Sequence, residues 1–327
     1  MKDKKTMKSS RFNRQIAKPM YAIAVALMFL LPLGSFGQGT TKSTVTAKKF
    51  ATPEAAANAL VEAAEKYDVT TLEAIFGPAG KEIVHTGEPA RDKEMAQKFA
   101  EQARMKMELS VDPTTKRRAF LTVGNDDWPF PVPIVKTGNT WSFDSKAGLQ
   151  EILARRIGRN ELDAIEIARG YVEAQHEYAM EKHDNSKVNE YAQRIIATPG
   201  KQDGLAWQNP DGTWGGPVGE NVARAIERGY STKHQPFHGY YFTVLKGQGP
   251  AAPLGQMDYV VNGAMIGGFA LIAVPAEYGV TGVKTFIVSN DGVVYEKDLG
   301  PNTLQLAQKI ERFNPDRTWN PVEEQGR

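Results

Sequence analysis

The stretch EILARRIGRNELDAIEIARGYVEAQHEYAM, residues Glu151–Met180, lies near the middle of the 327-residue chain and decides the fold. Its apolar residues recur with the 3.6-residue period of an amphipathic helix. The predicted apolar stripe comprises Leu162, Ile165, Ala168, Val172, Gln175 and Ala179, with Tyr171 and Tyr178 at its flanks. Four apolar strand candidates follow along the chain, and they need such a helix to cover one face of their sheet.

A break is predicted within this stretch. Gly158 suits the left-handed position that follows a helix ending at Ile157. Asn160 can then cap a second helix, with Asp163 as the acidic partner in its first turn. The sequence therefore predicts a short helix over residues 147–157 and a longer helix over residues 161–181.

Residues 50–146 are predicted to form an N-terminal domain of helices followed by strands. Thr52-Pro53 and Asp68 have the residue types that begin helices, and a third helix is expected over 92–104. Alternating apolar residues then predict strands over 106–111, 118–123, 132–136 and 140–143. This order of elements resembles the nuclear-transport-factor-2-like (NTF2-like) cone, in which a curved antiparallel sheet often holds a pocket.

Residues 147–320 are predicted to form a second domain, followed by a tail over 321–327. A helical piece is expected over 186–196. Four strands are predicted over 239–245, 269–275, 283–289 and 293–299, the last two joined by a hairpin turn at Asn290-Asp291-Gly292. A long helix on an antiparallel meander resembles the pilin and pseudopilin modules. The fold class predicted for the whole chain is α+β.

The first 37 residues have the composition of a cleavable signal peptide. Basic residues precede an apolar run from Tyr21 to Leu33, which is shorter than the roughly 20 residues that span a membrane. Ser35 and Gly37 provide small side chains before a predicted cleavage between Gly37 and Gln38. An uncleaved N-terminal anchor is the alternative. Residues 38–49 are polar and are predicted to be a disordered lead.

Charge and cysteine content exclude several classes of function. The formal charge is +2, but residues 1–37 contain seven basic residues and one acid; without them 33 basic and 37 acidic residues remain, a net charge of −4. Such a body has no basic excess for a nucleic-acid backbone. The chain has no cysteine, which excludes disulfides, thiolate nucleophiles and cysteine-ligated metals. No cofactor or metal is predicted.

Several long strings, in order, resemble an exported bacterial family catalogued as a domain of unknown function, serial number twenty-nine fifty. They are WSFDSKAGLQEILARRIGRNELDAI (141–165), YVEAQHEYA (171–179), HGYYFTVLKGQGPAA (238–252), GGFALIAVPAEYG (267–279) and TFIVSNDGVVYEKDLG (285–300). The resemblance implies a periplasmic or secreted protein and brings no catalytic residues with it.

Two groups of side chains are candidate sites. The first is a ligand site or an interdomain anchor, because guanidinium groups pair with carboxylates or phosphates and a helix N-terminus adds backbone donors. It comprises Arg155, Arg156, Arg159, Asn160 and Glu161. The second is an aromatic binding surface for sugars or peptides, comprising Trp207, Trp214, Tyr240 and Tyr241.

Three functional hypotheses remain open. The leading one is a non-enzymatic binding or structural protein of the periplasm or cell envelope, with a small ligand or an envelope protein as its partner. The second is an enzyme that uses an NTF2-like pocket, with His85 and a carboxylate from Asp68, Asp92 or Asp126 as acid and base. The third is a pilus- or secretion-associated subunit, which needs an exposed apolar helix face. No stable membrane span is expected after signal cleavage.

Overall fold

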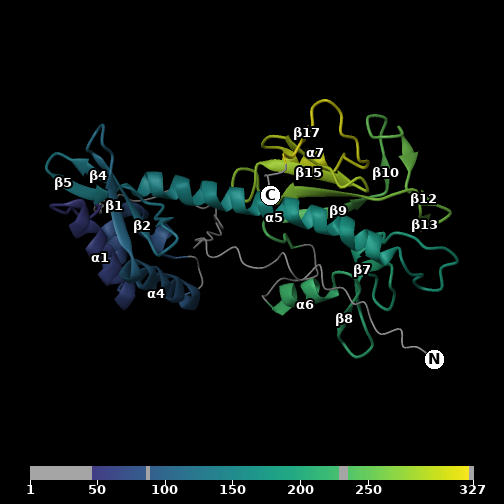
Figure 1. Cartoon of the computed structure of the whole chain (residues 1–327), viewed down its shortest axis with the longest axis horizontal. Helices are drawn as coiled ribbons and strands as arrows, with labels where there is room; N and C mark the ends of the chain where they lie inside the picture. The colour runs from purple at the N-terminus through teal and green to yellow at the C-terminus, as the bar shows by residue number, and fades with distance from the viewer. Residues whose placement is uncertain (1–45, 86–88, 228–234, 324–327) are drawn as a thin grey trace, which may run out of the picture. The chain divides into compact units, whose positions relative to one another are not determined.

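The computed structural model describes residues 46–85, 89–227 and 235–323. It divides the chain into two compact units, Met1–Leu153 and Ala154–Arg327, each with its own hydrophobic core (Figure 1). Both units combine helices with antiparallel sheets, so the predicted α+β class is confirmed.

The helices of the N-terminal unit begin where their capping residues predict. Helix α1 spans Pro53–Lys66 and α2 spans Val69–Phe76; the Thr52 hydroxyl accepts from the Ala55 amide at 3.1 Å, and the Asp68 carboxylate accepts from the Thr71 amide at 3.1 Å. These bonds satisfy amides that a helix start leaves without partners. The unit also contains the 3-10 helix η1 (Gly77–Ala79), α3 (Gly80–Val84) and α4 (Pro89–Met105).

The N-terminal sheet has the order β1-β2-β4-β5, and all its pairings are antiparallel. Its strands are β1 (Met107–Val111), β2 (Arg118–Val123), β4 (Ile134–Thr137) and β5 (Thr140–Phe143), with β3 (Trp128–Pro129) also paired to β2. Alternate residues of β2 are buried, as expected for a sheet with one covered face. The buried residues join the helices in one core: Ala119, Leu121, Val123, Ile134, Trp141 and Phe143.

Helix α5 spans Ser145–Tyr178 without interruption, so the predicted break at Gly158 is wrong. A Cβ added at Gly158 would meet no atom within 4 Å, and the residue continues the helix rather than ending it. The cost of about 1 kcal/mol for a glycine inside a helix is small beside the burial that the helix gains. Without a break, Asn160 is an interior helix residue and not a cap.

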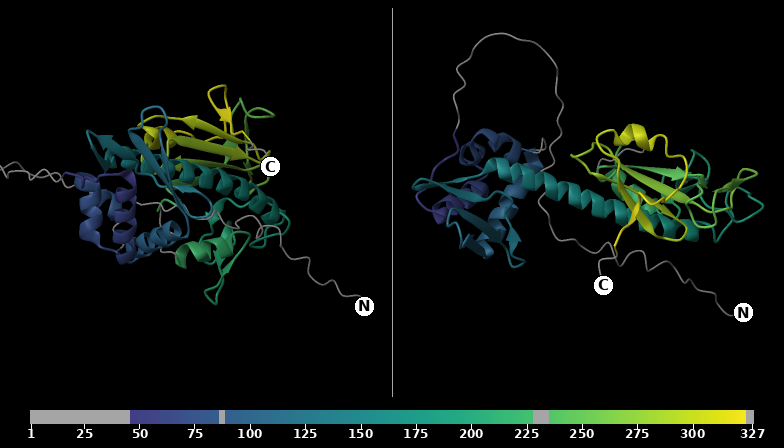
Figure 2. Two further views of the ribbon diagram at one scale, coloured as in Figure 1. Left: turned by 60° about the vertical axis from the view of Figure 1, so that its left-hand side comes forward. Right: turned by 90° about the horizontal axis from the view of Figure 1, so that it is seen from above.

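The C-terminal part of α5 lies along one face of a five-stranded sheet (Figures 1 and 2). Its buried residues are Ala164, Ile165, Ala168, Tyr171, Val172, Ala174, Gln175 and Tyr178. Leu162, predicted on the stripe, is 55% exposed, so that assignment is wrong. The stripe is centred nearer Tyr171 and Tyr178, the residues that the sequence placed at its flanks.

The C-terminal sheet has the order β17-β16-β15-β14-β9, with antiparallel pairing throughout. Its strands are β9 (Tyr240–Leu245), β14 (Ala270–Pro275), β15 (Lys284–Ser289), β16 (Val294–Asp298) and β17 (Asn320–Pro321). The four predicted strands are confirmed, and β17 adds a fifth. Short helix α7 (Thr303–Ala307) precedes β17.

The segment between α5 and β9 differs from its prediction. No helix forms over 186–196; an irregular segment leads to β6 (Arg194–Ile196), which pairs in parallel with β7 (Gly204–Gln208). Asp184 and Asn185 adopt left-handed backbone angles, φ 48° and 60°, which turn the chain away from a helix. β8 (Trp214–Gly215) and α6 (Gly219–Glu227) follow.

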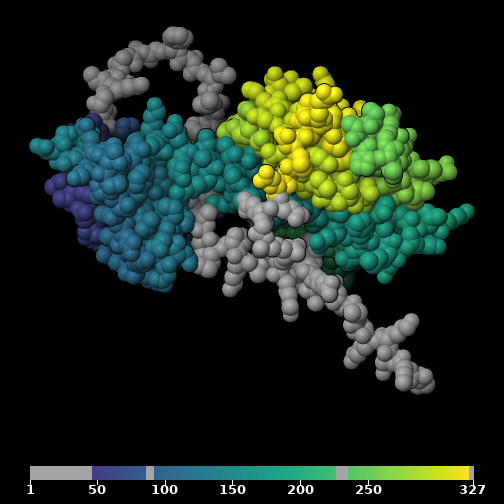
Figure 3. Space-filling view, turned by 45° about the horizontal axis from the view of Figure 1, so that its top comes forward, coloured from purple at the N-terminus to yellow at the C-terminus, as the bar shows by residue number. Residues whose placement is uncertain are grey.

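Four short strands complete the C-terminal unit as two ribbons: β10 (Gly247–Gln248) with β11 (Met257–Asp258), and β12 (Val260–Val261) with β13 (Ala264–Met265). The first ribbon is tied to the C-terminal segment, because the Gly249 amide donates to the Phe313 carbonyl at 2.8 Å. Figure 3 shows this green segment beside the yellow C-terminal one.

Candidate functional site

Two residues of the predicted anchor bind the loop that precedes β15. The Asn160 side-chain amide donates to the Thr281 carbonyl at 2.8 Å. One carboxylate oxygen of Glu161 accepts from the Val283 and Lys284 amides, at 2.9 and 3.0 Å. All of these residues belong to the C-terminal unit. Because amides bound to a carboxylate form comparatively strong hydrogen bonds, Glu161 fixes α5 to the N-terminal end of β15.

The three arginines of the predicted anchor precede this pair on the same helix. Arg155, Arg156 and Arg159 are all half-buried and all have interaction partners. Burial lowers the pKa of Arg156, and the charge of Arg159 lowers it further, while Glu277 opposes the change. The ligand-binding and interdomain roles predicted for this group remain predictions.

Beside the anchor lies a histidine–carboxylate pair that the sequence did not indicate. His238 Nδ1 is 2.6 Å from a carboxylate oxygen of Asp163. His238 and Gly239 have left-handed φ angles of 48° and 76°, and a Cβ at position 239 would lie 2.5 Å from Asn160 Nδ2. Glycine at position 239 therefore allows Asn160 to reach Thr281. The dipeptide His238-Gly239 before a strand was the available signal.

A second histidine cluster lies in the N-terminal unit. His85 follows α3, and its Nε2 lies 2.8 Å from Glu73 Oε1. Its Nδ1 lies 3.8 Å from Asp92 Oδ2, and the Asp92 side chain is 1% exposed. Burial raises the pKa of Tyr67, and the charge of Asp92 raises it further.

Of the carboxylates predicted for His85, only Asp92 is placed beside the ring. Asp68 is committed to the start of α2. Glu73, the closer carboxylate, was missed because the turn through η1 that returns the chain to α2 leaves no periodic signal. The two carboxylates approach opposite ring nitrogens, so they do not converge on one point as metal ligands would. Among the described residues, no group of three histidines, aspartates or glutamates has a metal-binding arrangement.

The N-terminal unit, for which the sequence predicted a pocket, has a surface hollow of about 460 Å³. Its lining excludes His85 and includes the pair Arg104–Glu65, whose atoms are 2.8 Å apart. The lining residues are Glu65, Gln97, Ala100, Glu101, Arg104 and Met105. All of them come from α1 and α4.

The structure places the predicted aromatic residues on different sheets. Trp207 and Trp214 lie on paired strands β7 and β8, while Tyr240 and Tyr241 lie on β9. Trp207 is covered by glycine backbone, since a Cβ at Gly216 would lie 2.7 Å from its ring. Tyr240 is fully buried and its hydroxyl donates to the Lys284 carbonyl at 2.9 Å. Tyr240 is therefore a core residue, and its ring is not accessible to a ligand at the protein surface.

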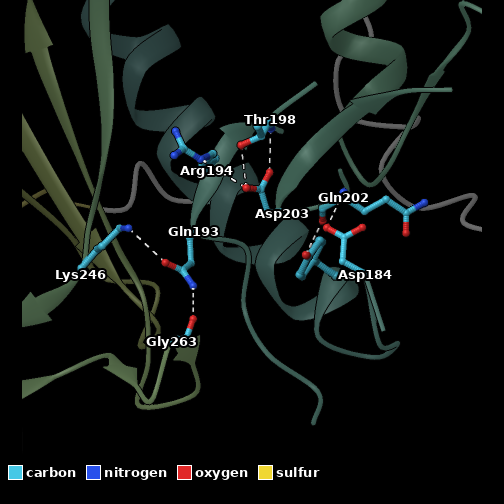
Figure 4. A network of polar contacts seen from close by, with 9 residues as sticks. Asp184, Gln193, Arg194, Thr198, Gln202, Asp203, Lys246 and Gly263 are labelled. Atoms are coloured by element: carbon cyan, nitrogen blue, oxygen red, sulfur yellow. Dashed lines mark hydrogen bonds and ion pairs between the residues drawn. The ribbon is translucent and has the colours of Figure 1, made fainter. Parts of the chain in front are cut away.

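A polar network holds the irregular segment that replaces the predicted helix over 186–196 (Figure 4). The Asp203 carboxylate accepts from the Thr198 amide and hydroxyl, at 2.7 and 2.8 Å, and lies 3.5 Å from Arg194 Nε. Burial alone would raise the pKa of Asp203, but the bonds from Thr198 and the charge of Arg194 lower it. Gln193 links Lys246 Nζ to the Gly263 carbonyl, at 3.1 and 2.7 Å. Two of these five contacts, those to the Thr198 amide and the Gly263 carbonyl, end on main-chain atoms and hold the backbone of this segment in place.

These observations define an α+β protein of two units. The polar side chains described above contact other groups of the same chain. A sequence model for the family described as "Protein of unknown function (DUF2950)" matches residues 47–322, and the chain belongs to this family. No curated protein and no solved structure matches the chain. In the described part of the chain, no helix has the length and apolarity needed to cross a membrane.

Proposed function

We propose that this protein is exported and acts in the cell envelope by binding rather than by catalysis. The export step is supported by residues 1–37, whose basic start, short apolar run and small residues before Gln38 are typical of a cleavable signal. An envelope protein or a small ligand would be its partner.

The observation that carries the non-catalytic part is the use of the polar side chains on α5. An active site needs polar groups directed at a substrate. Here Asn160 and Glu161 are bound to main-chain atoms of Thr281, Val283 and Lys284. Side chains so engaged hold the fold together and leave recognition to other surfaces.

Export is tested by fractionation of a bacterium that expresses the full chain or a form lacking residues 2–37. We expect the full chain in the envelope or secreted fraction, with an intact mass that begins at Gln38, and the shortened form in the cytosol. A pelleted form that retains residues 1–37 would identify the uncleaved anchor. A cytosolic full-length chain of uncleaved mass would contradict the proposal.

One observation favours a second candidate, an acid–base centre at His85. The imidazole faces two carboxylates, Glu73 at 2.8 Å and Asp92 at 3.8 Å, and a carboxylate that orients a histidine is a common part of catalytic sites. Burial, and then the charge of Asp92, raise the pKa of Tyr67.

This candidate is tested with the mature chain and a panel of esters, amides and phosphoesters. Catalysis through His85 predicts a turnover that falls about 100-fold or more in His85→Ala and that Glu73→Gln also lowers. His176→Ala, a change at an exposed histidine of the C-terminal unit, is the matched control. Turnover that survives His85→Ala removes the candidate.

The pilus or secretion hypothesis has less support. It needs an apolar helix face free for assembly, whereas the apolar residues of α5 between Ala164 and Tyr178, apart from the half-buried Ile167, are buried in the C-terminal core.

A further inference from the structure

The turn between β1 and β2 carries an exposed run of three cations. Lys116, Arg117 and Arg118 are consecutive, and all three are exposed. Within the described residues, none of the three forms an ion pair within 4.0 Å, although the charge of Arg118 contributes to the lowered pKa of Asp112. Lys136 lies beside the run, because its amide donates to the Arg117 carbonyl at 2.8 Å. The body of the protein has no basic excess, so this concentration of charge is a local feature.

The backbone of this turn is held in one conformation by Asp112. Its carboxylate accepts from the Thr114 amide at 2.8 Å, and from the Thr115 amide and hydroxyl at 3.2 and 2.9 Å. The Lys116 amide donates to the Asp112 carbonyl at 2.9 Å. The cations are therefore presented on an ordered scaffold, which lowers the entropy lost on binding an anionic surface.

An apolar side chain accompanies the cations. Phe120, on β2, is 45% exposed. Phe120 follows Arg118 by two residues on β2, so the two side chains leave the same face of the sheet. A cation beside an exposed aromatic ring suits the boundary between lipid headgroups and acyl chains. An acidic polymer in water would use the charges and gain little from Phe120.

We propose that the β1–β2 turn is a peripheral docking site for a bilayer with anionic headgroups. Lys116, Arg117 and Arg118 would pair with lipid phosphates, and Phe120 would enter the headgroup layer. The inference rests on the proposed function to the extent that export brings the chain to a membrane surface. Attraction of this kind acts within about one Debye length, roughly 8 Å in physiological salt, so the acidic charge elsewhere on the chain opposes it little.

The test is sedimentation of the purified mature chain, from Gln38 onward, with vesicles of phosphatidylglycerol and phosphatidylcholine or of phosphatidylcholine alone. We expect binding to the anionic vesicles that weakens as salt is raised. Each cation near an anionic surface strengthens partitioning about fivefold, so the triple variant Lys116→Glu, Arg117→Glu, Arg118→Glu should weaken it at least about 100-fold.

A matched variant makes the same charge change elsewhere. Lys182, Lys187 and Lys201 are exposed residues of the C-terminal unit, and their joint replacement by glutamate should reduce binding far less. Equal losses in the two triple variants, with unchanged thermal melting, would overturn the site. Absence of binding to anionic vesicles at low salt would overturn it too, and that result is independent of the fractionation that tests export.

The variant Phe120→Ser distinguishes binding to a bilayer from binding to an acidic polymer. Without the ring that would enter the headgroup layer, vesicle binding should weaken about tenfold, and binding to polyglutamate should be unchanged. Equal binding of the wild-type chain to vesicles and to polyglutamate, insensitive to Phe120→Ser, would replace the bilayer by an acidic macromolecule and refute the proposal.

Discussion

Replacement of Gln175 by leucine is expected to lower the free energy of unfolding of the C-terminal unit by about 3–5 kcal/mol. Gln175 is fully buried in the middle of α5. Its amide group donates to the Ala192 carbonyl and accepts from the Ala192 amide, both at 2.8 Å. It also donates at 2.8 Å to the hydroxyl of Tyr171, which donates in turn to the Ala270 carbonyl of β14.

Leucine has a similar volume but leaves three buried polar groups without that partner. Each buried group that loses its hydrogen bond costs about 1–3 kcal/mol, and the two main-chain groups of Ala192 have no route to water. Calorimetry of the mature chain measures the loss, and hydrogen exchange at the Ala192 amide locates it. Gln305→Leu, the same change at an exposed site on α7, is the control and should alter stability by less than about 0.5 kcal/mol. A Gln175→Leu protein as stable as wild type would show that Ala192 is not held by this side chain.

Gln175 also shows how far periodicity can predict this fold. Its place on the apolar stripe was correct, because a helix repeat identifies the face that will be buried whatever residue occupies it. The repeat could not show that Leu162, earlier on the same helix, would be exposed at 55%. That outcome depends on where the covering sheet ends, and the strands of that sheet, β9 to β17, lie far along the chain from Leu162.

The starts of helices were predictable where the capping hydrogen bond joins residues that are close in the sequence. Thr52 and Asp68 bond to amides three residues away, and their helices begin as predicted. Gly158 failed as a signal because the alternative to a helix end, burial of the continuing helix, is decided by long-range packing. For the same reason the segment over 186–196 was wrongly assigned to a helix: its network depends on Lys246 and Gly263.

The contacts of the candidate site residues could not be predicted from the sequence. Asn160 and Glu161 were identified from their place in the sequence, but their partners lie 121 to 123 residues away. Likewise, Asp163 and His238 are 75 residues apart. A single sequence contains no information on such pairings, whereas strand order within a meander follows from the short connections between strands.

The second large effect is expected at alkaline pH. Four tyrosines of the C-terminal unit are buried, and their hydroxyls are held away from water: Tyr171, Tyr178, Tyr240 and Tyr259. Burial raises the pKa of Tyr259 to about 12, and the charge of Asp291 adds to the effect. Burial also raises the pKa of Tyr240, with further contributions from Glu161 and Glu296. The pKa values of Tyr171 and Tyr178 are raised chiefly by burial as well.

A raised tyrosine pKa means that the folded unit binds its protons more tightly than the unfolded chain does. This stabilisation is complete below about pH 10, where an unfolded tyrosine ionises, and it is lost as the pH rises towards about 12. Each retained proton contributes about 1.4 kcal/mol per pH unit, so four tyrosines remove about 5 kcal/mol for each unit above pH 10. That slope is as large as the whole stability of many domains.

We therefore expect the C-terminal unit to unfold cooperatively between about pH 10 and pH 12, with tyrosinate absorbance and loss of circular dichroism in one step. The N-terminal unit is the internal comparison, since Tyr67 is the only tyrosine among its described residues, and its amides should stay protected at the pH where those of β14 exchange. Tyr259→Phe should make the pH dependence shallower by about a quarter, because one of four retained protons is removed. Tyrosine ionisation that is gradual and precedes any loss of structure would show that these hydroxyls reach water in the folded protein, and the close packing of α5 on β14 would then be untenable.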